Sequence, residues 1–208
     1  MVYYVNAGII PKDEGPEYSP YFEWLDGEIG KVALYDRTPD GGRVIVRLGA
    51  GRPLKPDYMP TKIKKVDPNR KPTPLLDVES WCGNFLANQT FKDILEELEP
   101  ETHQFFPMEI FEKGEKIADY YWLNVCNRLD TFHPELTYPR NERGFWKPVQ
   151  GEPSSVVFST TAIGDHHAWT DKFAGSGGHG LYISDTFAAR LQNANLTGLS
   201  FYKLEEQA

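Results

Sequence analysis

The chain has 208 residues, of which 40% are hydrophobic and 13% aromatic, and its 30 acidic and 22 basic residues give a net charge of −8. That hydrophobic content excludes a disordered chain, because disorder requires low hydrophobicity together with high net charge. The negative charge disfavours nucleic acid as a partner, since phosphate repels it, and it favours a basic protein. The same charge is equally consistent with a role in solubility alone.

The cysteine content and the first residues indicate the cellular compartment in which the protein is expected. Two cysteines, Cys82 and Cys126, are too few for a disulfide framework in a chain of this length, which favours a reducing environment. The opening residues lack the basic and apolar regions of a signal peptide, and no stretch approaches the ~18 apolar residues of a membrane-spanning helix. We therefore expect a cytoplasmic protein with no membrane partner.

The N-terminal part predicts strands. Val2–Val5 is β-branched and aromatic. Lys31–Tyr35 and Arg43–Leu48 are expected to form a hairpin, because the Pro, Asp and Gly residues of Thr38–Gly42 supply turn conformations. A short strand is expected at Thr61–Val66.

Prolines mark a candidate linker. Six of them lie between residues 52 and 74, where they exclude a continuous helix. The chain is therefore divided into an N-terminal strand-rich region, residues 1–75, which could be a separate lobe, and a second region, residues 76–208.

The clearest helix is predicted at Thr90–Glu99. Its apolar residues recur at i, i+3, i+4 and i+7, and Asn88 or Thr90 can cap it before Pro100 ends it. Near the C-terminus, Ser184 is expected to cap a second helix, which ends near Asn193 and carries Asp185 in its first turn.

Strand patterns surround these helices. Gln104–Phe111 and Ile117–Cys126 predict a second hairpin, with Pro107 favouring an edge or a bulge. Further strands are expected at Val156–Ser159, Leu181–Ile183 and Leu199–Leu204. Because hairpin signals outnumber helical periodicity, we expect an α+β fold, mainly antiparallel sheet with a few short helices.

Two groups of residues are candidate sites. The outer face of the Thr90–Glu99 helix and the residues after it carry carboxylates that suit either an acidic binding face or simple solvation: Asp93, Glu96, Glu97, Glu99 and Glu101. A later segment gathers potential ligands or acid–base groups: Asp165, His166, His167, Asp171 and His179. A metal-dependent hydrolase using the 165–179 cluster is therefore the alternative function. Adjacent histidines on an extended chain point in opposite directions, which favours histidines near a binding surface instead.

Other chemical motifs are incomplete. The glycines of Gly175–Gly180 match a dinucleotide-binding spacing, but they precede a strand instead of following one, so we expect a loop and no cofactor. Cys82 could act as a nucleophile with His103, His133 or His166 as base, or it could be a buried structural cysteine.

Several segments carry a shared pattern: Glu96–Pro100, His103–Glu109, Tyr120–Val125, Leu129–Asp130, Trp169, Leu181–Asp185 and Leu196–Leu199. Together they resemble a bacterial family, immunity protein family eleven. The resemblance covers roughly the second half of the chain, and the first 75 residues are only loosely comparable.

This resemblance implies a protein that neutralises a cognate toxin by binding it in the producer's cytoplasm, with the toxin encoded by an adjacent gene. It implies no catalytic residues. His103, Trp169, Ser184, Asp185 and Gly198 are then expected to be structural, and the proposed partner contacts are the carboxylates at 93–101 together with His166, His167 and His179. A scaffolding or regulatory module with another partner remains a further alternative.

Overall fold

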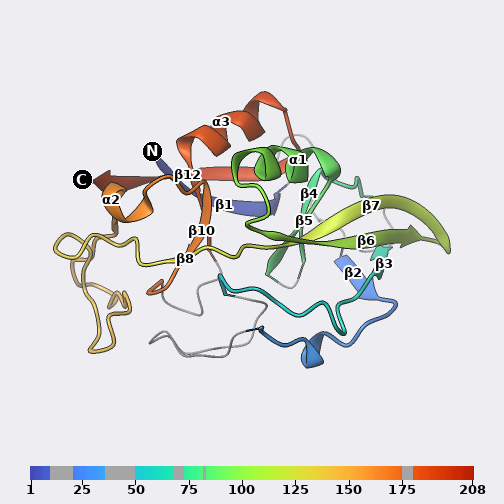
Figure 1. Cartoon of the computed structure of the whole chain (residues 1–208), viewed down its shortest axis with the longest axis horizontal. Coiled ribbons are helices and arrows are strands. Elements are labelled where there is room, and N and C mark those ends of the chain that lie inside the picture. Colours follow the sequence, from blue (N-terminus) through green and yellow to red (C-terminus); the bar gives the residue numbers. More distant parts are fainter. Residues whose placement is uncertain (10–20, 36–49, 68–72, 82, 175–179) are drawn as a thin grey trace.

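The computed structural model describes residues 1–9, 21–35, 50–67, 73–81, 83–174 and 180–208. These ranges contain twelve strands, three short α-helices and one 3₁₀ turn, η1 (Ile29–Lys31), and the strands form two six-stranded sheets (Figure 1). The expected α+β fold is therefore wrong, and the fold is β-rich. Sequence reasoning undercounted the sheet because strands such as β1 extend beyond their most apolar residues and pair with segments far away in the chain.

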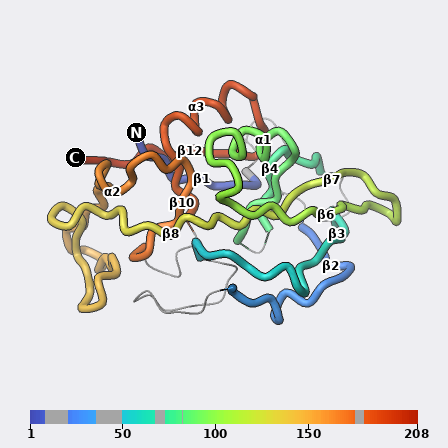
Figure 2. The backbone as a smooth tube through the Cα atoms, in the orientation of Figure 1, coloured from blue at the N-terminus to red at the C-terminus, as the bar shows by residue number. Residues whose placement is uncertain are grey.

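Sheet A is built around the first strand of the chain. In spatial order it contains β8 (Arg128–Leu129), β10 (Ala168–Asp171), β11 (Leu181–Ser184), β1 (Val2–Ile9), β12 (Gly198–Gln207) and β9 (Val157–Ser159). β1 is antiparallel to both β11 and β12, whereas the edge strands β8 and β9 run parallel to their neighbours. The two ends of the chain consequently lie side by side (Figure 2).

Sheet B has the β6–β7 hairpin at its centre. Its order is β2 (Tyr21–Trp24), β3 (Lys62–Val66), β6 (Gln104–Glu112), β7 (Glu115–Asn124), β5 (Asn84–Ala87) and β4 (Val78–Trp81). β3 pairs with β6 only from Glu109 to Phe111, so Pro107 lies beyond β3 and pairs across to Tyr121 alone. This explains how a proline occupies an interior strand. Pro107 itself pairs in regular register, and the bulge of this hairpin lies between Ile110 and Phe111, away from the proline for which a bulge was expected.

The helices α1 (Gln89–Leu98) and α3 (Asp185–Asn193) lie next to each other, while α2 (Thr160–Ile163) is a single turn (Figure 1). Asn88 caps α1 by accepting a hydrogen bond from Phe91 N at 3.0 Å, and Ser184 caps α3 through Phe187 N at 3.2 Å. Both predicted helices are confirmed. The rings of Phe91 and Phe187 meet with centroids 5.5 Å apart, and both side chains are fully buried.

Three apolar clusters fill the interior. The first lies beneath α1 and α3 and joins them to both sheets, and the third packs Trp169 and Phe158 against the outer part of sheet A. The second covers the other face of sheet B and contains a group of three indoles, Trp24, Trp81 and Trp122, each within 5.6 Å of the other two by ring centroid.

The N-terminal region differs from expectation at one predicted strand. Lys31–Tyr35 is not a strand: one 3₁₀ turn ends at Lys31, and only Leu34 forms a bridge, to Leu54. The predicted strand Arg43–Leu48 and its turn lie outside the described residues. The first 75 residues contribute β1 to sheet A and β2 and β3 to sheet B, so a boundary near residue 75 does not separate the two sheets.

Candidate functional site

The carboxylate of Glu99 is the centre of a buried polar network. Glu99 follows α1 directly and is only 8% exposed. Its Oε2 accepts hydrogen bonds from His103 Nε2 at 2.8 Å and Ala168 N at 2.9 Å. Its Oε1 accepts from Asn127 Nδ2 at 2.9 Å and His166 Nδ1 at 3.3 Å. Both oxygens are thus occupied, and the expectation that Glu99 presents its carboxylate to a partner is corrected by this burial.

The hydrogen bonds of His103 determine its tautomer. A backbone N–H can only donate, so Nδ1 of His103 accepts the hydrogen bond from Cys126 N at 3.1 Å. The neutral ring therefore carries its proton on Nε2 and donates it to Glu99. His103 is buried, which fits the structural role that the resemblance implied for it.

The electrostatics of Glu99 follow from these contacts. Burial by itself raises the pKa of a carboxylate, but the hydrogen bonds from His103 and from backbone N–H groups outweigh it and lower the pKa of Glu99 to about 2. Glu99 is therefore a permanently ionised link between the end of α1 and the start of β10. It is a structural group, since its oxygens face protein donors on all sides.

A surface cleft adjoins this network. It is lined by residues of α2, of the start of α3 and of both termini, among them Asp165, His166, His167, Asp185 and Glu206. Within it, His167 Nδ1 lies 2.7 Å from the hydroxyl of Ser184, while His166 is turned to Glu99. The two adjacent histidines thus have different partners, as the alternation of an extended chain requires.

The described part of the chain contains no assembled metal centre of the kind that the hydrolase alternative requires. No group of three or more His, Cys, Asp or Glu residues is arranged there to hold a metal ion. Asp171 is fully buried and its carboxylate accepts hydrogen bonds from Thr131 and Phe173, so it closes a turn instead of facing the cleft. His179 and Cys82 lie outside the described residues.

Cys126 does not have the properties of a nucleophile. Its thiol is half-buried, and burial raises its pKa to about 11, so the reactive thiolate is scarce at neutral pH. No histidine ring contacts its sulfur among the described residues; its recorded neighbours are Gln104 and Asn124.

The exposed carboxylates of α1 form an acidic face next to the cleft. Asp93 and Glu97 are exposed, Glu96 is half-buried, and Glu101 is exposed just beyond the helix. Asp93 accepts a hydrogen bond from Gln89, and Glu97 forms an ion pair with Arg190 of α3. Glu99, which follows α1, contacts His166 of the cleft lining and so links the end of this helix to the cleft.

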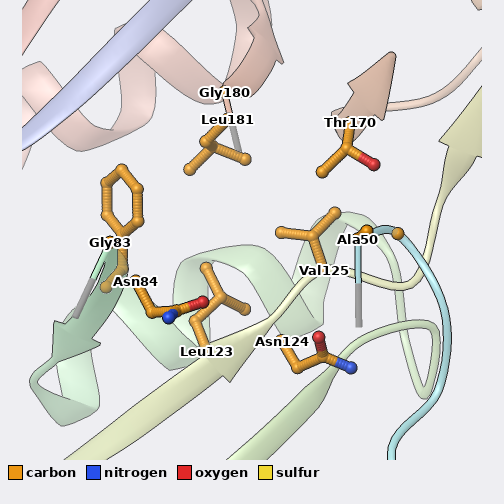
Figure 3. Close-up of a pocket in the computed structure, with 11 residues that line it drawn as sticks. Ala50, Gly83, Asn84, Leu123, Asn124, Val125, Thr170, Gly180 and Leu181 are labelled. Carbon is orange, nitrogen blue, oxygen red and sulfur yellow. The ribbon is translucent and has the colours of Figure 1, made fainter. Parts of the chain in front are cut away.

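A second pocket lies where the two sheets meet (Figure 3). Leu123 and Val125, from the end of β7 and just beyond it, face Leu181 of β11 and Thr170 of β10 across it. Among the described residues, no charged side chain lines it. Its rim includes Gly51, where a side chain would meet Thr170 Oγ1 at 2.4 Å, which explains glycine at a backbone φ of +85°.

Sequence reasoning placed the structural residues well and missed the network. Trp169 is fully buried, Ser184 caps α3, and Gly198 turns the chain at φ +88°, as predicted. Asn127 was not predicted as part of any site, although it joins Glu99 to the carbonyl of Ala168. The spacing of Glu99 and His103 at i and i+4 was the available signal, but a chain pattern does not show that the pair is buried.

Comparison with known proteins identifies the chain's relatives. The model of the immunity protein family Imm11 matches residues 23–206. This match covers nearly the whole chain, so the expectation that the likeness is confined to the second half is wrong. No curated protein matches the chain. In the described part, no helix is long and apolar enough to cross a membrane.

Proposed function

Because the chain belongs to the Imm11 immunity protein family, we propose that it binds a cognate bacterial toxin in the cytoplasm and neutralises it without catalysis. The observation that carries this proposal is the family match over residues 23–206, which includes strands of both sheets and all three helices. The toxin is expected to be the product of an adjacent gene.

The acidic face of α1 and the adjoining cleft are the proposed contacts. Asp93, Glu96, Glu97 and Glu101 are exposed or half-buried on α1 and just after it, and His166 and His167 line the cleft. Such a face is complementary to a basic toxin surface, and charge of this kind chiefly accelerates association and rejects other partners. His179, from the same predicted set, remains a proposed contact that lies outside the described residues.

Co-expression tests the proposal. The neighbouring gene's product is expected to arrest growth when expressed alone and to be harmless when expressed with this chain, and the two proteins are expected to co-purify in a fixed ratio. An immunity protein with a different partner, added at equal expression, controls for nonspecific relief. Persistent toxicity despite soluble expression of this chain would reject the proposal.

A further inference from the structure

Two segments lie on the opposite side of the molecule from α1 (Figure 1), and their buried residues belong to the same apolar cluster as the indoles of sheet B. We call residues 28–35 and 53–59 the tyrosine platform. Its segments are joined by backbone hydrogen bonds: Tyr35 N to Pro53 O at 3.1 Å, Lys55 N to Ala33 O at 2.7 Å, and Glu28 N to Tyr58 O at 2.9 Å. Its underside is anchored by four buried side chains, Val32, Leu34, Leu54 and Met59. The platform is therefore a fixed surface.

Tyr58 holds an unfavourable backbone conformation on this platform. Its φ is +67°, a left-handed region that bulky residues rarely adopt and that glycine or asparagine occupies at less cost. Yet the side chain is 53% exposed, so the fold gains little burial from it. A strained residue whose ring faces solvent points to a role outside stability.

The surroundings of Tyr58 define a hollow with cationic groups. It is lined by Lys31, Ala33, Lys55, Asp57 and Tyr58. Lys31 Nζ lies 5.5 Å from the centroid of the Tyr58 ring and pairs with Glu28 at 2.6 Å. Lys55 is exposed and forms no ion pair with any described residue. Lys31 is thus neutralised by Glu28, and Lys55 is the other cation of the hollow, with Asp57 as the acidic residue among its described lining.

Apolar groups continue this surface. Tyr35, at the other end of the segment pair, is 59% exposed. Exposed tyrosines beside a lysine that has no ion pair within the described ranges are suited to a binding surface, where a rigid aromatic ring supplies contact area at a low entropic cost.

We infer that the tyrosine platform is a second contact surface for the toxin, and that it receives a carboxylate side chain between Lys55 and Tyr58; this rests on the proposed function. The chemistry of the hollow decides the occupant: among the described residues Lys55 has no ion-pair partner, and a cation of this kind beside the Tyr58 ring is complementary to an acidic side chain that stands in an apolar surface. The platform and the acidic face of α1 lie on opposite faces of sheet B, so they bind separate segments of the toxin.

Tyr58→Asn is the decisive variant. Asparagine tolerates a positive φ, so the melting temperature is expected to be equal to or above that of the wild type. Binding to the purified toxin, measured by calorimetry, is expected to weaken tenfold or more. A residue that served the fold alone would show the opposite pattern, with lower stability and unchanged affinity.

Lys55→Glu tests the charge of the occupant. It is expected to weaken binding more than Lys55→Ala does, and the difference is expected to shrink as salt is raised. The matched controls are Tyr202→Ala and Lys203→Glu on β12, which remove an equally exposed tyrosine and a similar cation from sheet A. Both are expected to bind as the wild type does.

The outcomes separate this inference from the function. If the wild type binds the toxin and Tyr58→Asn and Lys55→Glu bind it equally well, the platform is not a contact surface and the proposed function stands. If the wild type itself binds no toxin, both proposals fail together.

Discussion

Oε2 of Glu99 lies 2.9 Å from the backbone nitrogen of Ala168, so a carboxylate just after α1 fixes the start of β10, a strand 69 residues further along the chain. The same group holds His103 and Asn127. One side chain thus joins the end of helix α1 to the segment between β7 and β8 and to sheet A, and four hydrogen bonds depend on its charge.

Replacing Glu99 with alanine is expected to destabilise the protein by about 3 kcal/mol, because buried donors lose a charged acceptor. Urea unfolding followed by fluorescence measures this change. The control is Glu101→Ala, an exposed carboxylate two residues away, which is expected to change stability by less than about 0.5 kcal/mol. Equal effects of the two substitutions would contradict the network.

Lowering the pH is expected to remove the contribution of Glu99 to the stability of the fold. Its pKa is about 2 in the folded protein against 4.5 for a free glutamate. A lowered pKa means that the stabilisation is complete above pH 4.5 and declines as the pH falls towards 2. Unfolding measured between pH 6 and pH 3 is expected to show a steeper loss of stability for the wild type than for Glu99→Ala. Parallel curves would be inconsistent with the assigned pKa.

The contribution of Glu79 to stability changes with pH in the opposite direction. It is 1% exposed in β4 and accepts one backbone hydrogen bond, from Leu76 N at 2.9 Å. Burial raises its pKa to about 7 despite that bond and the charge of Lys65. A raised carboxyl pKa costs stability as the pH rises from 4.5 through 7, because the unfolded chain ionises freely.

Glu79→Gln removes this cost. The variant is expected to gain stability relative to the wild type between pH 5 and pH 8, by up to about 3 kcal/mol. Thermal unfolding of both proteins at pH 5 and at pH 8 measures this gain in stability. Glu96→Gln on the surface of α1 is the control. A stability difference between variant and wild type that does not change with pH would exclude the raised pKa.

Gly198 admits no side chain. Its φ is +88°, and a Cβ there would lie 2.2 Å from the carbonyl oxygen of Val78. Gly198→Ala is therefore expected to lower stability by more than about 2 kcal/mol, through backbone strain and a clash that no side-chain movement relieves. Gly83→Ala also has a positive φ but open space around it, so it isolates the cost of conformation alone. Equal losses would show that the contact with Val78 is unimportant.

The acidic face of α1 is expected to act on the rate of toxin binding. Asp93→Lys combined with Glu96→Lys should slow association at low salt about tenfold and change dissociation little, because exposed charges steer encounter. Stopped-flow measurements at two salt concentrations test this. The matched control is Lys203→Glu on β12. A rate independent of both substitution and salt would exclude this face.

Local signals in the sequence predicted local structure. Asn88 and Ser184 preceded apolar stripes at helical spacing, and both cap the helices that those stripes form. The β6–β7 hairpin was also apparent, because its two apolar runs flank a Lys-Gly turn. Each of these features depends on neighbours within about ten residues.

Local signals in the sequence could not predict which distant segments pair with each other. Lys31–Tyr35 has the alternation of a strand, with Val32 and Leu34 buried, but its pairing with the segment around Leu54 amounts to an isolated bridge and not to a strand. Glu99 similarly resembles its exposed neighbours Glu97 and Glu101 in the sequence. What distinguishes it is the arrival of Ala168 and Asn127, which only the tertiary fold provides.

The central position of β1 has a consequence for the order of folding. Val2 pairs with both Ser184 and Leu204, so the first strand meets its neighbours only after almost the entire chain has emerged from the ribosome. Sheet B, whose strands lie between Tyr21 and Asn124, can assemble before that. Closing so long a loop is slow, and β1 must wait with both edges unpaired. During synthesis, the aromatic residues of β1 are thus the part of this chain with the greatest need of protection from aggregation.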